Sequence, residues 1–558
     1  MKKLFILSLS ALTGSFISRA QAPFFLDPNF GNGGVEVVRN NEWTPQFGPY
    51  VTYKVRNMIV GADDKIWLSG NVAAIYSVEG VSTDHALTRL LPNGKPDPSF
   101  NGTGHLNFGA TNQPDVKWMD NMVLLPDNKL LYAGNSTQNN ASRTIIYKVN
   151  NNGTLDNTFG TGGVVRHSGP LPFNDLKTLE VQSTGKIIAL TASFNNTTST
   201  GVILRLNSNG SIDNTFGTSG FVQPTIGFPD NKIGFGMIKI LPDNSFLVVG
   251  THTADAASGA PPYSAHQDFI AKFSADGVLQ TNFGTNGKTI LPKGSNDRLS
   301  FLNKYIDVDI NGNIYVNCSV QDLTPTPGIT AFPVEVTVYK LNANGALVNS
   351  YGQNGRLGIP GTYAGSFHFY DAQVQNGDQL LVASMTDTGM NANYLVKRIN
   401  ADGSDDLTFT GSSAIITGTR NALDHFHFLG LQSDNKIIVG GWGRKQKTTG
   451  SDTLHPVIMR IVDHETTVDT STAVVNIKDQ QQIKVFPNPV GNRLYIAGMN
   501  TNARIRIFDI SGKAILNTIL SATKPEPVDC SPLVPGLYWL QLQEERSAII
   551  YTQKLIKQ

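Results

Sequence analysis

Residues 155–165, LDNTFGTGGVV, decide the fold, because the chain repeats this stretch. Six further copies begin at Leu26, Lys95, Ser211, Leu279, Leu347 and, in degenerate form, Asp405. The aromatic residues of the seven copies are Phe30, Phe100, Phe159, Phe216, Phe283, Tyr351 and Phe409, so successive copies lie 70, 59, 57, 67, 68 and 58 residues apart. A period of about 60 residues is too long for a helical solenoid repeat, and it predicts one four-stranded propeller blade per copy.

A second unit, a strand hairpin, also recurs seven times. In ILPDNSFLVVG from Ile240, short apolar runs flank a Pro-Asp-Asn turn. The other copies begin at Val60, Leu124, Val181, Val308, Val374 and Leu431. Apolar runs on both sides of a turn suit strands that are covered on both faces, as the inner strands of a propeller are. The seven hairpins predict seven blades.

The two ends of this array complement each other. The last hairpin is followed by a third strand, VIMRIVDHE from Val457, but by no Phe-Gly segment, whereas the first Phe-Gly segment precedes every hairpin. We therefore expect residues 26–38 to complete the blade that begins near Phe426, which would close the ring and remove an open sheet edge. An open, curved β array with capping end units is the alternative.

The rest of the chain predicts an exported protein of two domains. Lys2 and Lys3 precede an apolar run at residues 4–17, and small residues follow at 20–22, so residues 1–22 are expected to be a signal peptide. Residues 23–465 would form the propeller, and the polar residues 466–483 a linker. Residues 484–558 would form a small Ig-like β-sandwich. The expected fold is thus all-β: a seven-bladed β-propeller closed by N- and C-terminal strands, then the sandwich.

Charge, hydrophobicity and cysteine content give no sign of a nucleic-acid partner, a membrane span or a disulfide framework. The 44 basic and 43 acidic residues give a net charge of +1, which favours neither nucleic acid nor an anionic membrane. No second long apolar segment predicts a transmembrane span. Cys318 and Cys530 lie in different predicted domains, so we expect two unpaired, buried thiols. A monomer is expected.

The repeat has close copies in RLNSNGSIDNTFGTSG from Arg205 and KVNNNGTLDNTFGTGG from Lys148. This pattern, over about residues 24–462, resembles the delta-60 repeat family. The resemblance implies a β-propeller-like domain and says little about activity. The degenerate copy at Thr410-Gly411 and the missing tail of the last unit depart from the family pattern.

The C-terminal segment carries Phe486-Pro487-Asn488-Pro489, a turn at residues 509–513, a Pro-Gly-Leu-Tyr segment and a basic end. In this it resembles the type A C-terminal sorting domain of the type IX secretion system. The matching residues are Pro487, Asn488, Pro489, Gly512, Gly536, Tyr538, Lys554 and Lys557. The resemblance implies partnership with the type IX machinery, passage through the outer membrane, and release or attachment at the cell surface. An ordinary accessory sandwich is the alternative.

Common catalytic motifs are missing from the sequence. It contains no HExxH, GxSxG, P-loop or CxxC, and we expect no cofactor. Asp307, Asp309 and Asn311 open like a calcium loop, but Cys318 stands where a bidentate glutamate belongs. We therefore predict a hairpin turn there and no metal site.

Alignment of the hairpins on their turn residue reveals variable positions eleven and nine residues upstream. They should lie where the chain enters each inner strand, near one mouth of the central channel. Cationic and aromatic groups there could bind an acidic or sugar-like ligand. His425 and His427, on one strand face, could also share a metal, although no third ligand is evident. The candidates are Lys54, Arg56, Trp118, Lys177, Lys304, His368, Tyr370, His425 and His427.

Three functions are compatible with this sequence. The first is a secreted or cell-surface binding protein, whose partner would be a surface glycan or another surface protein. The second is a carbohydrate-active hydrolase or lyase, for which Asp120 and Asp175 are the only acidic pair among the variable positions. The third is a structural spacer, with the variable positions merely solvated.

Overall fold

The computed structural model describes most of the chain, as two compact units, Met1–Val468 and Asp469–Gln558. The predicted signal peptide and linker lie outside the described residues, as do His368, Tyr370 and Gly512. The described residues are 26–38, 51–74, 84–108, 116–138, 141–167, 174–195, 198–228, 232–253, 266–293, 297–322, 333–364, 371–375, 377–387, 392–406, 409, 414–417, 425–445, 453–462, 484–497, 502–509, 514–521, 526–544 and 550–558.

In the first unit, the described residues form seven four-stranded antiparallel sheets. Sheet 1 contains β2 (Val51–Val60), β3 (Ile66–Ala74), β4 (Asp84–Leu90) and β5 (His105–Asn107); sheet 2 contains β6 (Val116–Leu124), β7 (Leu130–Gln138), β8 (Ala141–Val149) and β9 (Val164–His167). Sheet 3 contains β10 (Asn174–Val181), β11 (Ile187–Asn195), β12 (Thr198–Leu206) and β13 (Phe221–Val222); sheet 4 contains β14 (Ile233–Ile240), β15 (Phe246–His252), β16 (Gln267–Phe273) and β17 (Lys288–Ile290). Sheet 5 contains β18 (Asp297–Val308), β19 (Ile314–Asp322), β20 (Pro333–Leu341) and β21 (Arg356–Ala364); sheet 6 contains β22 (Ala372–Gln375), β23 (Gln379–Asp387), β24 (Ala392–Ile399) and β25 (Ala414–Thr417). Sheet 7 contains β26 (His425–Leu431), β27 (Ile437–Lys445), β28 (Thr453–Ile461) and β1 (Val35–Val37).

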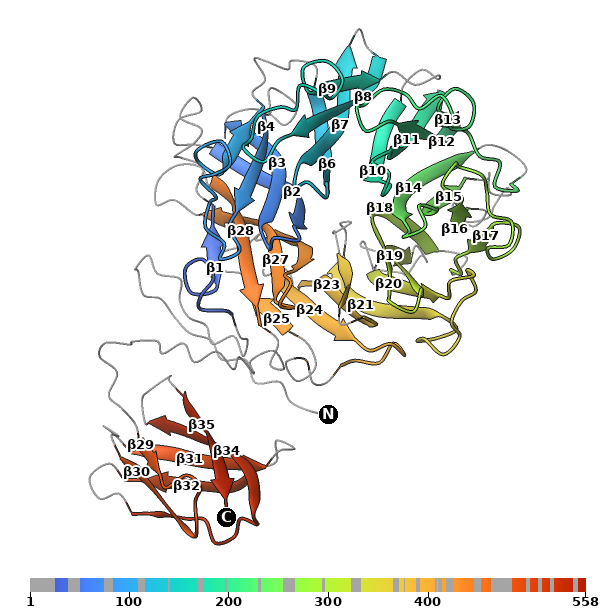
Figure 1. The fold of residues 1–558 in the computed structure, drawn as a ribbon. Coiled ribbons are helices and arrows are strands. Elements are labelled where there is room, and N and C mark those ends of the chain that lie inside the picture. The colour runs from blue at the N-terminus through green and yellow to red at the C-terminus, as the bar shows by residue number, and fades with distance from the viewer. Residues whose placement is uncertain are drawn as a thin grey trace. The chain divides into compact units, whose positions relative to one another are not determined.

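The sheets follow one another around a ring, and Figure 1 shows the first strands β2, β6, β10, β14 and β18 on its inner side. Each first strand contacts the first strand of the next sheet, and β26 of sheet 7 contacts β2 of sheet 1. Because every inner strand has such a neighbour on both sides, the ring of inner strands is closed.

The N-terminal strand β1 completes sheet 7. It runs antiparallel to β28, with Val35 opposite Met459 and Val37 opposite Val457. This is the pairing that the ends of the repeat array predicted. Phe30 is fully buried, and the guanidinium carbon Cζ of Arg460 lies 4.9 Å from the centroid of the Phe30 ring. The N-terminal segment therefore contributes both a strand and a core side chain to a sheet made by the other end of the array.

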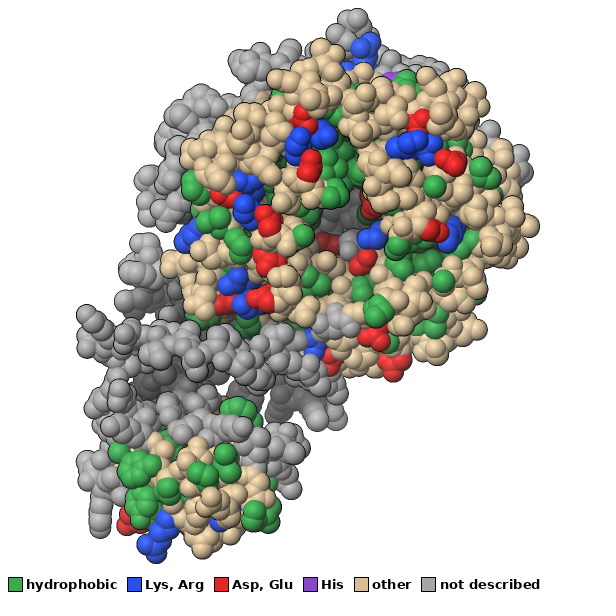
Figure 2. Space-filling view, in the orientation of Figure 1, with side chains coloured by type: hydrophobic (Ala, Val, Ile, Leu, Met, Phe, Trp, Pro, Cys, Tyr) green, Lys and Arg blue, Asp and Glu red, His purple; other side chains and the backbone are tan. Residues whose placement is uncertain are grey.

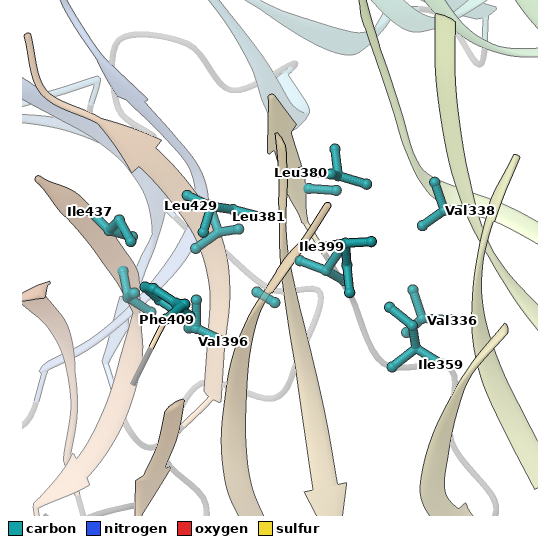
Figure 3. Packing of buried hydrophobic residues seen from close by; sticks show 14 of the residues in the cluster. Val336, Val338, Ile359, Leu380, Leu381, Val396, Ile399, Phe409, Leu429 and Ile437 are labelled. Carbon is teal, nitrogen blue, oxygen red and sulfur yellow. The ribbon is translucent and has the colours of Figure 1, made fainter. Parts of the chain in front are cut away.

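Neighbouring sheets pack through apolar side chains from both faces of each strand. Figure 3 shows Leu380 and Ile399 of sheet 6 turned toward Val338 and Ile359 of sheet 5, while Leu381 turns toward Leu429 of sheet 7. Successive residues of β23 thus serve opposite neighbours, because side chains alternate along a strand. This explains why the hairpins read as continuous apolar runs instead of alternating patterns.

The recurring LDxxFG stretch builds a latch between sheets. In sheet 3 the buried Arg205 donates a 2.7 Å hydrogen bond from Nε to Asp213 of the stretch, and it lies 4.6 Å above the Phe216 ring. Asp213 Oδ1 also accepts the backbone N–H of Thr215, which holds the turn. From its Nη1, Arg205 donates to the carbonyl of Ala275 in sheet 4. One arginine therefore joins its own turn to the next sheet.

The arginine–aspartate pair of this latch recurs around the ring, where Figure 2 shows basic and acidic side chains side by side at intervals. The Nε–Oδ2 distances are 2.8 Å for Arg89 and Asp97 and 2.6 Å for Arg398 and Asp406. Arg460 joins Asp27 across the chain ends at 2.9 Å. Sheets 4 and 5 carry Gln280 and Val348 at the aspartate position. The residues that define the repeat are thus structural.

The second unit packs two sheets around its own core. One contains β29 (Lys484–Phe486), β30 (Arg493–Ala497) and β33 (Val528–Asp529). The other contains β32 (Ala514–Leu520), β31 (Ala503–Asp509), β34 (Gly536–Glu544) and β35 (Ile550–Lys557), in that order. Ile505, Ile507 and Leu540 are fully buried between them. Cys318 of the first unit and Cys530 of the second are both buried, and neither forms a disulfide within the described structure. No described residue belongs to a helix that could cross a membrane.

Candidate functional site

The structure describes the side chains of three predicted ligand-binding residues. Lys54 is half-buried on β2, 5.8 Å from the ring centroid of Trp442. Arg56 is exposed on the same strand, and Lys177 is exposed on β10 of sheet 3. Of these three residues, only Lys54 and Arg56 share a sheet. Trp118 and Asp120 in β6, Asp175 in β10, Lys304 in β18, and His425 and His427 in β26 have side chains outside the described part, and His368 and Tyr370 lie outside it entirely.

The position nine residues before the turn coincides with a β-bulge. The strand register shifts at Arg56, Lys177, Gly236 and His427, between the residues on either side of each. A bulge places an extra residue outside the ladder, which explains why this position varies while the residue before it is apolar in all four strands. The simple alternation that placed His425 and His427 on one strand face therefore does not apply to them.

A cluster of charged side chains lies on the inner strands of neighbouring sheets, and it is the candidate site. Glu180 comes from β10, Lys239 from β14 and Asp307 from β18, while Asp371 directly precedes β22. Lys239 Nζ lies 3.2 Å from Asp307 Oδ1. Figure 2 shows acidic and basic groups at the centre of the ring, where this face is hollowed. We call these four residues the central cluster.

Each carboxylate of the central cluster reaches into the next sheet. Glu180 accepts the backbone N–H of Ile240 at 2.7 Å, and Asp307 accepts that of Val374 at 3.0 Å. Asp371 accepts the N–H of Leu429 at 2.8 Å. An innermost strand has an unpaired edge, so these carboxylates satisfy donors that the ladder leaves free. They tie sheets 3 to 7 together and still retain lone pairs for a ligand.

Burial sets the protonation of the central cluster. It raises the pKa of Asp371 to about 7, although two backbone N–H groups oppose it, and it raises the pKa of Glu180. For Lys239, burial alone would lower the pKa, but the charges of Asp307 and Glu180 outweigh it and raise the pKa above the ordinary lysine value. At neutral pH the cluster therefore combines a lysine ammonium, an ion-paired carboxylate and a carboxyl that is close to titration.

The raised pKa of Asp371 predicts a pH-dependent stability. A carboxyl that binds its proton more tightly in the folded state stabilises that state at low pH, and this contribution is lost as pH rises through about 7. We expect the unfolding free energy of the wild type, relative to Asp371→Asn, to fall by roughly 1 kcal/mol per pH unit between pH 5 and 7. Urea unfolding across this range measures it, and a flat difference would contradict the prediction.

The central cluster was not foreseen, although the sequence contains a signal for it. Glu180, Lys239 and Asp307 all stand six residues before the turn residue of their hairpins. The same position is Ile59, Val123 and Gly430 in sheets 1, 2 and 7. A charge within an otherwise apolar inner strand is the informative feature, because such a position needs a partner.

Several predicted sorting residues hold the second unit together. Asn488 Oδ1 accepts the N–H of Ile556 at 2.9 Å, and Pro487 and Pro489 both follow cis peptide bonds. Tyr538 donates its hydroxyl to the carbonyl of Val534 at 2.9 Å. Lys557 is buried and donates to Asn492 at 3.1 Å. Gly536 begins β34, and the side chain of Lys554 in β35 lies outside the described part.

Two family models match parts of the chain. Residues 484–558 match the secretion system C-terminal sorting domain, and residues 125–159 and 182–216 match a β-propeller domain of unknown function, DUF5122. These matches confirm the predicted sorting domain and agree with the delta-60 resemblance. The sorting domain indicates export by the type IX system to the extracellular space or the cell surface. No curated protein sequence is similar enough to match the chain.

Solved structures that resemble this chain share little sequence with it. The polysaccharide lyase Uly1 has a TM-score of 0.45 at 10% identity, covering 73% of this chain and 89% of its own. The GH93 α-L-arabinofuranosidase of Fusarium graminearum has a TM-score of 0.38 at 9% identity, covering 62% and 93%. A fungal alcohol oxidase of the AA5 family has a TM-score of 0.37 at 13% identity, covering 91% and 98%. At such scores, none of these similarities indicates an activity for this chain.

Proposed function

We propose that this chain, which its sorting domain directs out of the cell, is a seven-bladed β-propeller that binds a hydroxyl-rich ligand, such as a surface glycan, at the centre of the ring. Residues 1–22 serve as the signal peptide, 23–465 form the propeller, 466–483 the linker, and 484–558 an Ig-like sandwich. The seven described sheets and the pairing of β1 with β28 support the blade count. The protein acts as a monomer.

The observation that carries this proposal is a charged residue at one inner-strand position, which occurs in neighbouring sheets on one side of the ring and not in the others. Six residues before the turn residue, the inner strands of sheets 3 to 5 carry Glu180, Lys239 and Asp307, whereas those of sheets 1, 2, 6 and 7 carry the uncharged Ile59, Val123, Gln373 and Gly430. Asp371 of sheet 6 stands two residues before Gln373. Structural need alone does not require a charge at this position, because the other sheets pack with an uncharged residue there. A ligand held by a few convergent polar groups does require it.

The chemistry of the central cluster favours hydroxyl groups. Its carboxylates accept hydrogen bonds, and Lys239 donates them, so adjacent sugar hydroxyls can satisfy both. The carboxyls outnumber the single lysine, so the cluster does not favour an anion.

A glycan microarray probed with the full-length protein and its variants tests this function. We expect Lys239→Gln and Asp307→Asn each to weaken binding of the retained glycans at least 10-fold, because each change removes a hydrogen-bonding group from the cluster. Lys397→Gln, which alters a half-exposed ion pair on the outer part of sheet 6, is the matched control. Unchanged glycan binding by both cluster variants, with folding intact, would overturn the central site.

A second candidate, glycoside cleavage, is favoured by one observation. Asp371 has a pKa raised to about 7 and interacts with Asp307, which is ion-paired to Lys239. A protonated carboxyl beside a charged carboxylate is the pair that acid–base cleavage of a glycosidic bond needs. Release of reducing ends from a bound polysaccharide, lost in Asp371→Asn while binding persists, would support cleavage. Asp120 and Asp175 are the alternative pair, to be tested as Asp120→Asn and Asp175→Asn.

A further inference from the structure

A second polar site lies between sheets 1 and 2, apart from the central cluster. The strand register places Lys54 opposite Asn71 and Asn71 opposite His85, across β2, β3 and β4. Ser69 stands two residues before Asn71 on β3, so its side chain shares their face. On this face Trp67 and Leu87 pack against Met119 and Tyr132 of sheet 2. The row of Ser69, Asn71 and His85, the sheet 1 site, therefore faces the neighbouring sheet.

The polar atoms of the sheet 1 site are buried and lack partners. Ser69 is 0% exposed, His85 3% and Asn71 9%. Within the described structure, Ser69 Oγ, Asn71 Oδ1 and both ring nitrogens of His85 make no hydrogen bond. Buried polar groups in proteins are nearly always satisfied by protein, water or ligand. Four such atoms on one face indicate that a hydrogen-bonding molecule belongs there.

The corresponding asparagine of sheet 2 shows what a filled position looks like. Asn135 stands six residues after the turn residue Lys129, as Asn71 stands six after Lys65. Asn135 Oδ1 accepts the N–H of Leu176 at 2.7 Å, and its Nδ2 donates to the Leu176 carbonyl at 3.3 Å. The side-chain amide of Asn135 thus links sheet 2 to sheet 3 by two hydrogen bonds. Asn71 Oδ1 makes no such hydrogen bond from sheet 1 to sheet 2 within the described structure.

The chemistry of the sheet 1 site defines its ligand. Burial and the charge of Arg56 lower the pKa of His85 to about 4, so at neutral pH its imidazole offers one donor and one acceptor. Ser69 offers both roles, and Asn71 Oδ1 accepts. A hydroxyl group, which donates and accepts, complements this set. Arg56 is exposed and its charge acts on His85, so it can pair with a carboxylate on the same ligand.

We propose that the sheet 1 site binds a hydroxylated carboxylate, of which a uronic acid is the simplest sugar example. Its hydroxyl group enters the row of Ser69, Asn71 and His85, and its carboxylate pairs with Arg56. The site is separate from the central cluster, and it gives the propeller a means of selecting acidic from neutral sugars. An ordered water offers the same hydroxyl chemistry without the carboxylate, and the experiment distinguishes the two.

Calorimetric titration of the full-length protein with glucuronate, glucose and acetate tests this proposal. We expect glucuronate to bind at least 10-fold more tightly than glucose or acetate, because only it supplies both groups. Arg56→Gln should abolish the preference over glucose, whereas Arg166→Gln, at an exposed arginine of sheet 2, should not. Ser69→Ala and Asn71→Leu should each weaken glucuronate binding at least 10-fold. Ser69→Ala, the smaller change, serves if the leucine variant does not fold.

Two results would overturn the proposal. One is that glucuronate binds no more tightly than glucose, or that Arg56→Gln, Ser69→Ala and Asn71→Leu all bind glucuronate as tightly as the wild type. The other is an absence of glucuronate binding together with a higher melting temperature of Asn71→Leu, which would assign the site to ordered water that an apolar side chain replaces at a gain. The glycan binding of Lys239→Gln and Asp307→Asn reports on the central cluster alone, so either site can fail without the other.

Discussion

Deleting residues 26–38 should leave a protein that no longer unfolds as one cooperative propeller and that associates into oligomers. The deletion removes the buried Phe30, for which truncation alone costs about 3–5 kcal/mol. It also strands the buried Arg460 without Asp27, which costs about 3–5 kcal/mol more. β28 then becomes an open edge that can pair with another chain. Calorimetric unfolding and light scattering of the truncated protein measure both effects.

A synthetic peptide of residues 24–40 provides the control for this deletion. Added to the truncated protein, it should restore cooperative unfolding and reduce oligomers, because the register with β28 does not require a covalent link. The same peptide with Phe30→Ala should restore less. A truncated protein that is as stable and monomeric as the full chain would contradict the closure of sheet 7 by β1.

Replacing Arg398 by methionine should lower the free energy of unfolding by about 3–5 kcal/mol, because it leaves the buried Asp406 without its charged partner. The adjacent Lys397 forms an ion pair of the same length, 2.6 Å, with Asp405, whose side chain is 42% exposed. Lys397→Met should therefore cost about 1 kcal/mol or less. Chemical denaturation of both variants compares a latch with a surface pair one residue away.

The double variant Arg398→Met, Asp406→Leu separates the latch charge from its packing. Removing both partners leaves no buried charge, so we expect it to recover much of the stability lost in the single variant. The methionine also keeps apolar contact with the Phe409 ring, over which the guanidinium lies at 5.0 Å. Equal losses in Arg398→Met and Lys397→Met would show that the latch contributes no more than a surface ion pair.

The parts of the fold that the sequence predicted depend on local signals. Apolar runs around a turn specify a hairpin within about ten residues, and the incomplete units at both ends reveal that β1 joins β28. The latch was not predicted, because its meaning depends on Arg205 reaching the carbonyl of Ala275 in another sheet. Sequence spacing does not reveal such contacts.

The candidate site was predicted less well than the fold, for a related reason. The residues chosen at the entrance of each hairpin include the bulge positions, and only Lys54, Arg56 and Lys177 have described side chains. In the central cluster, Lys239 of sheet 4 pairs with Asp307 of sheet 5. In the sheet 1 site, the strand register places Asn71 opposite His85, and sequence spacing does not reveal that register. The central cluster is made by neighbouring sheets and the sheet 1 site by neighbouring strands of one sheet, so a search along one hairpin at a time does not find either of them.

Because β1 pairs with β28, the order of translation determines when the propeller can close. Translation makes Val35 near the start and Met459, its partner, near the end, so the first strand must wait for nearly the whole propeller before it can pair. The export signal at residues 484–558 is translated later still. A chain that ends before Thr453 therefore lacks both β28, the partner of β1, and the sorting domain.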